Sequence, residues 1–290
     1  MTLQDAVLWL NLEYLTAEDW VEGIHLLPSL QSNGVKKYFF CPGFSHKTGG
    51  LSYEAHLLSQ QTIHQTDKSH LRCQHQLPEI ADSLHVYVFG YADEIWPLWF
   101  EMWLRGNQKV TLWLAKGQVL SQLQNLYPNL QALQQVGQTV VCGKVTVCLV
   151  PFVAQAAFDE VLQAADVCVI RGEDSVLRAL WQGQCFWWQI YRQEENAHHI
   201  KLKAFWQRFE RDSEVLQDAL AQRVYWAHQA LSGELNDVAL LSHAKRQEAW
   251  QLVCDNRLYL AEFLQKWRQL LWQSASLSTQ LANFIRHQLK

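Results

Sequence analysis

The amino-acid sequence predicts an α/β protein built on a parallel sheet that helices cover on both faces. Between residues 84 and 190, short apolar runs of strand length alternate with amphipathic runs of helix length, which is typical of such a sheet. From about Glu195 onward, the pattern is helical to the end of the sequence. The composition, with 49% hydrophobic and 18% charged residues among 290, is that of a folded globular protein.

The elements of the middle region follow one another in a regular order. The expected strands are Leu84–Phe89, Val110–Leu114, one or two strands within Thr139–Leu149 around Gly143, Val167–Ile170 and Cys185–Ile190. The expected helices are Trp96–Leu104, Gln118–Gln135, Gln155–Ala165 and Ser175–Gln182. Together they predict a complete Rossmann-like domain. Beyond it, Gln247–Trp272 is a long amphipathic stretch that we expect to break near Asp255-Asn256.

The first 60 residues have a different character. Val7–Leu12 predicts a strand so apolar that it expects parallel neighbours, and Lys37–Cys41 predicts a second strand. Thr16 is expected to open a helix as its N-cap, with Asp19 in the capping-box position. Residues 60–83 are polar and rich in His, Gln and Ser, which predicts a linker or a long surface loop. We therefore interpret the N-terminal part as the end of a second unit.

Charge and cysteine usage narrow the class of protein. The net charge of -4 and the pI of about 6.3 give no reason to expect a nucleic-acid or anionic-membrane partner. The first residues have neither the basic region of a signal peptide nor an apolar run that could span a membrane. Seven cysteines without a Cys-x-x-Cys motif predict reduced core thiols in a cytoplasmic protein. The cluster of His64, His70, Cys73 and His75 matches no zinc spacing, so no metal is expected.

The most informative local feature is the segment from Ile170 to Ser175. A buried strand ends there and a helix is expected to begin at or near Ser175, and ligands of open α/β sheets bind at this carboxyl edge. Free N–H groups of the new helix suit a phosphate, Gly172 allows close backbone approach, and Arg171 can offset negative charge. An ordinary strand-to-helix turn with Asp174 as a cap would have the same sequence, so both interpretations stay open.

A second feature lies at the end of the first strand of this domain, at Phe89-Gly90-Tyr91. By the same edge rule, Tyr91 should face the same crevice as Ser175, unless it serves only in packing. The 14 tryptophans allow a similar choice, because aromatic rings either stack on sugars or fill a core. For most of them we expect the core.

A third feature is the segment Pro151–Phe158, just before an expected helix. The rings of Phe152 and Phe158 could stack on a nucleobase, and the amide of Gln155 could read an imide edge. A hydrophobic staple around a helix start would have the same residues. The segment therefore indicates a base-binding loop without requiring one.

Taken in order, these residues resemble a known family, the protein-arginine rhamnosyltransferases that modify elongation factor P. The resemblance is carried by Leu8–Leu15 with Thr16-Ala17-Glu18, Lys37–Phe40, Pro42–Phe44, Thr48–Leu51, Phe89-Gly90-Tyr91, Pro151–Val153, Gln155 with Phe158, Arg171–Ser175, and Phe205-Trp206 after His198-His199. Its most specific parts are Arg171–Ser175 and the Glu13-Tyr14-Leu15 segment. It runs through essentially the whole sequence.

The resemblance implies a GT-B glycosyltransferase, with two Rossmann-like domains that face each other across a cleft. Residues 1–75 would be a remnant of the N-terminal, acceptor-side domain plus a linker. Residues 76–230 would be the donor-binding domain, and residues 231–290 would be helices that pack back toward the N-terminal domain. The implied donor is dTDP-β-L-rhamnose, the acceptor is one arginine of elongation factor P, and the transfer inverts the anomeric centre without a metal or other cofactor.

The resemblance also implies roles for single residues. Phe152, Gln155 and Phe158 would hold the thymine. Tyr91, Arg171, Asp174 and Ser175 would line the diphosphate and the sugar, with Phe89 and Gly172 also among the substrate-binding residues. Glu173 is similar to the carboxylate that the family needs for activity, so we expect it to be catalytic.

The sequence departs from the family at one point. The family's first strand and its glycine-containing loop supply an aspartate expected to act as general base, and no stretch of this sequence matches them. We therefore expect an N-terminal domain that is incomplete by about a hundred residues, and a chain that is inactive as it stands. The alternatives are a donor-binding protein without catalysis and a different nucleotide-sugar transferase of the GT-B fold.

Overall fold

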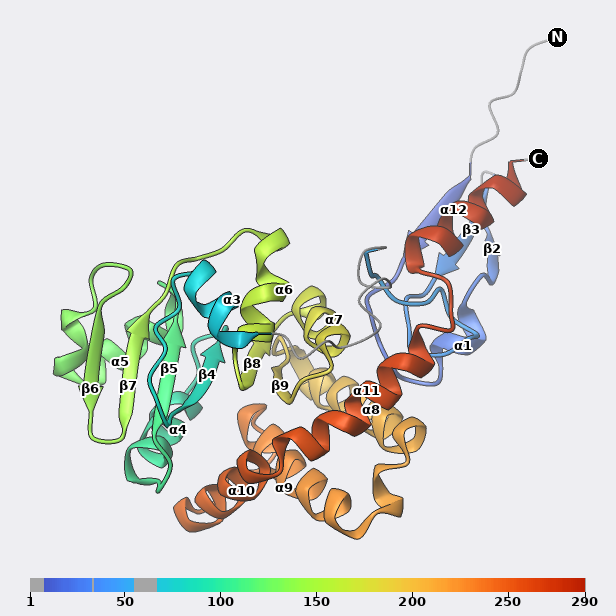
Figure 1. The fold of residues 1–290 in the computed structure, drawn as a ribbon. Helices are drawn as coiled ribbons and strands as arrows, with labels where there is room; N and C mark the ends of the chain where they lie inside the picture. Colours follow the sequence, from blue (N-terminus) through green and yellow to red (C-terminus); the bar gives the residue numbers. More distant parts are fainter. Residues whose placement is uncertain (1–7, 33, 55–66, 290) are drawn as a thin grey trace.

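The computed structural model describes residues 8–32, 34–54 and 67–289, and it contains two separate sheets joined by helices (Figure 1). The strands are β1 (Trp9–Leu12), β2 (Pro28–Leu30), β3 (Lys36–Phe40), β4 (Leu84–Val88), β5 (Val110–Leu114), β6 (Thr139–Cys142), β7 (Val145–Leu149), β8 (Val167–Arg171) and β9 (Phe186–Gln189).

Most of the chain outside the sheets is helical. The α-helices are α1 (Val21–Ile24), α3 (Lys68–Gln74), α4 (Ile95–Arg105), α5 (Gln118–Leu126), α6 (Gln155–Ala164), α7 (Glu173–Gln182), α8 (Ala197–Ser213), α9 (Ala219–Leu235), α10 (His243–Asp255), α11 (Arg257–Leu271) and α12 (Leu277–Gln288). Three short 3₁₀ helices are η1 (Pro128–Ala132), η2 (Glu194–Asn196) and η3 (Val215–Gln217). The break between α10 and α11 falls at Asn256, where the sequence predicted it.

The larger sheet has six strands in the order β6-β7-β5-β4-β8-β9. All neighbours are parallel except the β6-β7 hairpin, which turns at Gly143 with φ of +58°. The predicted parallel sheet is therefore confirmed. From β4, the chain builds outward through β5 and β7 in one direction and through β8 and β9 in the other. The carboxyl ends of β4 and β8 thus form a topological switch point, where open α/β sheets bind their ligands.

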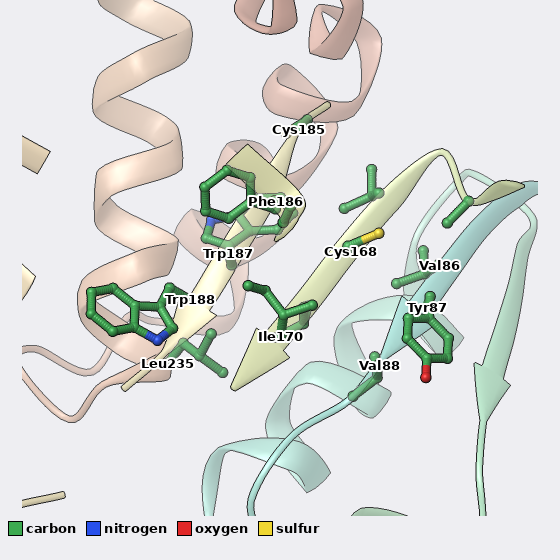
Figure 2. Close-up of a cluster of buried hydrophobic side chains, with 14 of the residues drawn as sticks. Val86, Tyr87, Val88, Cys168, Ile170, Cys185, Phe186, Trp187, Trp188 and Leu235 are labelled. Carbon is green, nitrogen blue, oxygen red and sulfur yellow. The ribbon is translucent and has the colours of Figure 1, made fainter. Parts of the chain in front are cut away.

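The core lies on both faces of this sheet and is rich in aromatic residues. Figure 2 shows β4, β8 and β9 with their buried side chains, together with Leu235 of α9. On β9, Trp187 stacks on His228 with ring centroids 4.9 Å apart, and on Trp250 at 5.5 Å. Six tryptophans are almost completely buried: Trp96, Trp99, Trp103, Trp113, Trp187 and Trp267. Four more are also buried, namely Trp181, Trp188, Trp206 and Trp250, so ten of the 14 tryptophans serve the core, as the sequence predicted for most of them.

The smaller sheet has the order β1-β3-β2, with β1 parallel and β2 antiparallel to β3. The C-terminal helix α12 packs on it, so helix α12 and strands β1–β3, from opposite parts of the sequence, lie side by side (Figure 1). Phe284 of α12 contacts the rings of Tyr38 and Phe40 at 5.2 and 6.3 Å, and the Tyr38 hydroxyl donates to Gln288 at 3.1 Å. Residues 277–288 thereby cover one face of the N-terminal sheet.

Two helix predictions were wrong. Thr16 does not cap a helix, because it forms a parallel bridge with Gly43 and its hydroxyl accepts the N–H of Glu18; the single turn of α1 begins only at Val21. The helix expected over 118–135 ends at Leu126, and η1 follows. Pro128 explains this end, since a proline lacks an N–H group and disfavours helical geometry in the preceding residue.

The interpretation of residues 60–83 as a linker or loop was also wrong in part. Residues 60–66 lie outside the described residues, but Lys68–Gln74 forms α3, which Asp67 caps by accepting the N–H of His70. The Arg72 Nε–H group donates to the carbonyl of Ala164 at 3.0 Å, at the end of α6. This tertiary contact explains why a polar segment is helical.

Within the described residues, no helix combines the length and the apolar character needed to cross a membrane. His64 lies outside the described part of the chain, and the described residues contain no cluster of His, Cys, Asp and Glu suited to a metal ion. All seven cysteines are described, and each is a free thiol.

Candidate functional site

The switch point is formed by the ends of β4 and β8. The N–H of Phe89 donates to the carbonyl of Val169 at 2.8 Å, which continues the ladder one residue beyond β4. After Arg171 the chain turns at Gly172, whose φ of +81° favours glycine, and α7 begins at Glu173. The helix therefore begins near Ser175, as predicted, but two residues before it, because the glycine makes the turn and no side chain caps it.

A cavity of about 170 Å³ opens beside this turn. It is lined by Tyr87, Phe89, Phe152, Val153, Gln155, Phe158, Asp174 and Ser175. Phe89 stands edge-on to Phe158 at 5.7 Å and to Phe152 at 6.2 Å, so three rings form one aromatic wall. The side chain of Phe152 is 74% exposed, which leaves its face available for stacking on a ligand. The cavity therefore has the shape and lining of a slot for a flat ring.

The first turn of α7 borders the cavity. The N–H groups of Glu173, Asp174 and Ser175 have no acceptor among the described residues, and the first bond of the helix runs from Val176 to the Gly172 carbonyl at 3.3 Å. The N-terminus of a helix carries a partial positive charge of about half a unit. Beside a slot for a flat ring, this turn supplies donors for an anion.

Arg171 and Tyr91 flank the cavity without lining it. The Arg171 guanidinium lies over the rings of Phe89 and Tyr91, at 4.7 and 4.6 Å from their centroids. The Tyr91 N–H donates to Gln189 Oε1 at 2.7 Å, and the Tyr91 carbonyl accepts from Trp96 Nε1 at 2.6 Å. The edge of the sheet thus holds both the tyrosine and the arginine next to the anion-binding turn.

Gly90 is required by this packing. A Cβ atom at this position would lie 2.5 Å from a ring carbon of Trp96 and 2.8 Å from Gln189 Oε1. Only glycine leaves room for these two side chains to hold the Tyr91 backbone.

Glu173 points to a different place from Asp174 and Ser175. Its Oε2 atom accepts the N–H of Leu15 at 3.2 Å, and its Oε1 atom lies 4.0 Å from Lys201 Nζ. The same ammonium lies 5.5 Å from the ring centroid of Tyr14, whose side chain is exposed. Glu173 therefore connects the start of α7 with the N-terminal segment and with α8, outside the cavity.

Arg178 lies one helical turn beyond Asp174 and was not predicted as a site residue. The Asp174 Oδ2 atom accepts from Arg178 Nε at 2.9 Å and from Gln155 Nε2 at 3.2 Å. The other guanidinium nitrogens donate to both oxygens of Asp159, each at 3.1 Å, and to Glu54 at 2.9 Å. Burial lowers the pKa of Arg178, but the bonds to Glu54 and Asp174 and the charge of Asp159 outweigh it, so the pKa lies above its ordinary value. The i, i+4 spacing of Asp174 and Arg178 was the available signal.

Tyr87 and Val153 also line the cavity and were not predicted. Tyr87 lies two residues before Phe89 and therefore on the same face of β4, which the alternation of a strand could have indicated. Burial raises the pKa of Tyr87, so its hydroxyl stays protonated at neutral pH. Its ring lies 6.0 Å from that of Phe158 and closes the inner end of the aromatic wall.

Comparison with known proteins places this geometry in a family. The model of the elongation factor P (EF-P) rhamnosyltransferase EarP matches residues 1–286. A protein-arginine rhamnosyltransferase of Neisseria meningitidis is 37% identical over 284 residues, which are 97% of this chain and 71% of that protein. One from Shewanella oneidensis is 42% identical over 209 residues, which are 70% of this chain and 53% of that protein.

A solved structure has the same fold. It comes from work on the structural basis for EarP-mediated arginine glycosylation of translation elongation factor EF-P, and it matches with a TM-score of 0.69 at 20% identity. The match covers 97% of this chain and 99% of the solved one. The predicted α/β fold of the GT-B type is thereby confirmed. Since the family model matches nearly the whole sequence and the Neisseria relative is similar over the same length, this chain belongs to the EarP family of protein-arginine rhamnosyltransferases.

Proposed function

We propose that the cavity at the switch point binds the nucleotide of dTDP-β-L-rhamnose, and that the reaction of this chain transfers rhamnose with inversion to one arginine of elongation factor P. The observation that carries the proposal is that a cavity for a base and a helix N-terminus for an anion lie next to each other. An aromatic cavity with one amide lies directly beside the free N-terminus of the ten-residue helix α7. A base joined to a diphosphate needs these two environments next to each other.

Thymine occupies the aromatic slot in this proposal. The exposed ring of Phe152 and the ring of Phe158 stack on the base, while Phe89 completes the aromatic wall. Gln155, which lines the same cavity, reads the imide edge of the base. The alternative interpretation, a hydrophobic staple, does not explain why the ring of Phe152 is exposed.

The diphosphate lies at the first turn of α7. The N–H groups of Glu173, Asp174 and Ser175 and the Ser175 hydroxyl donate to its oxygens, and Arg171 adds a positive charge beside them. These groups stabilise the charge that develops as the diphosphate leaves. Because they supply that stabilisation, we expect the transfer to need no metal ion.

The transfer is a direct displacement. A guanidinium nitrogen of the acceptor attacks the anomeric carbon, the carbon–oxygen bond to the diphosphate breaks, and dTDP leaves with the electron pair, so a β-linked donor gives an α-linked product. The guanidinium loses one proton to a carboxylate, which is needed because arginine stays protonated at neutral pH. Glu173, at the junction with the N-terminal segment, orients the acceptor. Because its oxygens already contact Leu15 and Lys201, we assign the proton to another carboxylate. Asp174, the carboxylate that lines the cavity, is already bonded to Arg178 and Gln155, so we expect this chain to bind the donor without transferring rhamnose.

Calorimetric titration of residues 1–290 with dTDP-rhamnose, followed by intact-mass measurement of elongation factor P incubated with both, tests the proposal. The expected result is donor binding that Ser175→Ala weakens, with no mass gain on the acceptor. Leu126→Ala, an exposed change on α5 far from the cavity in sequence, is the control and should bind like the wild type. Absence of binding would reject the donor site, and a gain of one rhamnosyl group would show that Glu173 or another residue of this chain accepts the proton.

We also propose a cytoplasmic location, on the evidence of the thiols. Five of the seven cysteines are buried, and all seven are free. Burial raises the pKa of Cys148 to about 12, so its thiol is protonated and unreactive at neutral pH. Free, inert thiols are typical of proteins that stay in a reducing compartment.

A further inference from the structure

We infer that Asp174, held in place by Arg178, fixes the orientation of the Gln155 amide and so makes the base slot select an imide base, thymine or uracil, over cytosine. The inference rests on the proposed function, since it assumes that the cavity binds a pyrimidine. It adds two positioning residues, one of them outside the cavity.

The orientation of the Gln155 amide follows from the chemistry of its partner. An ionised carboxylate has no hydrogen to donate, so only the nitrogen of the amide can face Asp174. The contact is Nε2 to Oδ2 at 3.2 Å. Among the described residues, Gln155 Oε1 has no hydrogen-bond partner. The amide oxygen is therefore the acceptor that Gln155 has left for a ligand in the cavity that it lines.

This orientation distinguishes the pyrimidines. Thymine and uracil carry a donor at N3 and an acceptor at C4, which match the free Oε1 and the second Nε2 hydrogen of Gln155. Cytosine carries an acceptor at N3 and a donor at C4, so it would need the amide turned by 180°. That rotation would place Oε1 against the Asp174 carboxylate, where two acceptors repel each other.

Arg178 keeps the carboxylate in the position that imposes this choice. Its side chain is 8% exposed, and the Nε–H group donates to the same Asp174 oxygen that Gln155 contacts. The other end of the guanidinium is fixed on Asp159 of α6, a side chain only 6% exposed on the helix that also carries Gln155. One buried arginine thus ties α7 to α6, and Asp174, itself 60% exposed, is positioned before any ligand arrives.

The test measures the dissociation constants of deoxyuridine 5′-diphosphate (dUDP) and deoxycytidine 5′-diphosphate (dCDP) for the purified chain by calorimetry. This pair differs only at the edge of the base and leaves the thymine methyl group aside. For the wild type we expect dCDP to bind roughly tenfold or more weakly, as for a site with mismatched polar groups. In Asp174→Asn, which tolerates either orientation of the amide, the ratio of the two constants should fall close to one.

Three variants separate positioning from other effects. Ser175→Ala should weaken both nucleotides and keep their ratio, since it removes a donor to the diphosphate. Arg178→Lys, which keeps the charge near Asp159 but loses the fork, should lower the ratio, whereas Glu54→Gln should leave it unchanged. A preserved ratio in both Asp174→Asn and Arg178→Lys, or a wild-type ratio near one, would overturn the inference while leaving the donor site in place. Failure of the wild type to bind either nucleotide would reject the donor site and the inference together.

Discussion

Polar groups cluster at both ends of β4 and β8. At the amino ends they have hydrogen-bond partners within the protein, and at the carboxyl ends several lack them within the described part of the chain. At the amino ends, Asp166 accepts from the backbone N–H of His85 at 2.9 Å and from Lys68 at 3.0 Å, and it lies 3.4 Å from Arg72. Burial alone would raise the pKa of Asp166, but the hydrogen bond from the His85 side chain and the charge of Lys68 hold it well below its usual range. Every one of these groups has its partner within the protein.

At the carboxyl ends, several polar groups lack a hydrogen-bond partner among the described residues. Three N–H groups of α7 have no acceptor among the described residues, the amide oxygen of Gln155 is without a partner there, and the ring of Phe152 is exposed. Unpaired donors next to exposed rings are costly unless a ligand or water covers them. In this sheet, the satisfied polar cluster therefore holds the strands together, whereas the unsatisfied groups mark where a ligand binds.

The largest expected effect comes from breaking the satisfied cluster. Asp166→Ala leaves the mostly buried guanidinium of Arg72 and the ammonium of Lys68 without their common carboxylate, and it should lower the free energy of unfolding by about 3–5 kcal/mol. Urea denaturation at pH 7.5 measures this loss. The same variant, below its unfolding transition, should bind dTDP as the wild type does. Weakened dTDP binding together with unchanged stability would reverse the roles that we give to the two ends.

A second polar group whose partner lies within the protein makes the stability depend on pH. His228 is completely buried, its ring contacts the Phe186 carbonyl at 2.8 Å, and burial lowers its pKa to about 4 from 6.5. Because the folded pKa is depressed, the stabilisation is present above pH 6.5 and is lost as the pH falls toward 4, by about 3 kcal/mol in all. Asp166 adds its loss only below its ordinary pKa of 3.8.

Urea unfolding at pH 7.5, 5.5 and 4.5 checks this sign and size. His228→Gln keeps a donor for the carbonyl but cannot titrate, so its stability should fall less than that of the wild type over this range. Parallel losses for the two proteins would mean that His228 is not the group that titrates.

The smallest of the three effects concerns the open end. Phe158→Ala removes one ring of the aromatic wall and should weaken dTDP binding by about 1–3 kcal/mol, the range found for stacking platforms. The change also costs packing against Tyr87 and Phe89, so binding is measured at a temperature where circular dichroism shows the variant folded. Leu126→Ala is again the control. Equal dTDP affinity in Phe158→Ala and the wild type would remove the ring from the base slot.

Sequence patterns were sufficient where local and tertiary preferences agree. The buried runs of β4, β5 and β8 were predicted within one residue, because a short, mostly apolar run between turns is typical of a buried strand in an α/β protein. Of the residues predicted for the substrate, Phe89, Phe152, Gln155, Phe158, Asp174 and Ser175 line one cavity. The carboxyl ends of parallel strands lie at the same edge of a sheet. Motifs that are far apart in the sequence could therefore be assigned to one site.

Prediction failed where a single backbone angle sets the start of a helix, or where a contact with a residue distant in sequence stabilises an element. The positive φ of Gly172 starts α7 two residues early, although Ser175 is the better N-cap by composition. The helix α3 has only Leu71 as a buried apolar residue and depends on Arg72 reaching α6. Arg178 acts through Asp159, 19 residues earlier, and no local pattern encodes that pair. The predicted boundaries at residues 75 and 230 and the roles assigned by resemblance stay predictions.

A crystal structure of this chain with dTDP bound would test the donor site most directly. We expect the base in the cavity against Phe152 and Phe158, with the diphosphate oxygens within hydrogen-bond distance of the N–H groups that begin α7. A nucleotide bound instead at the amino ends of β4 and β8, against Lys68 and Arg72, would contradict the assignment. It would also show that the satisfied cluster, and not the open one, is where this fold receives its ligand.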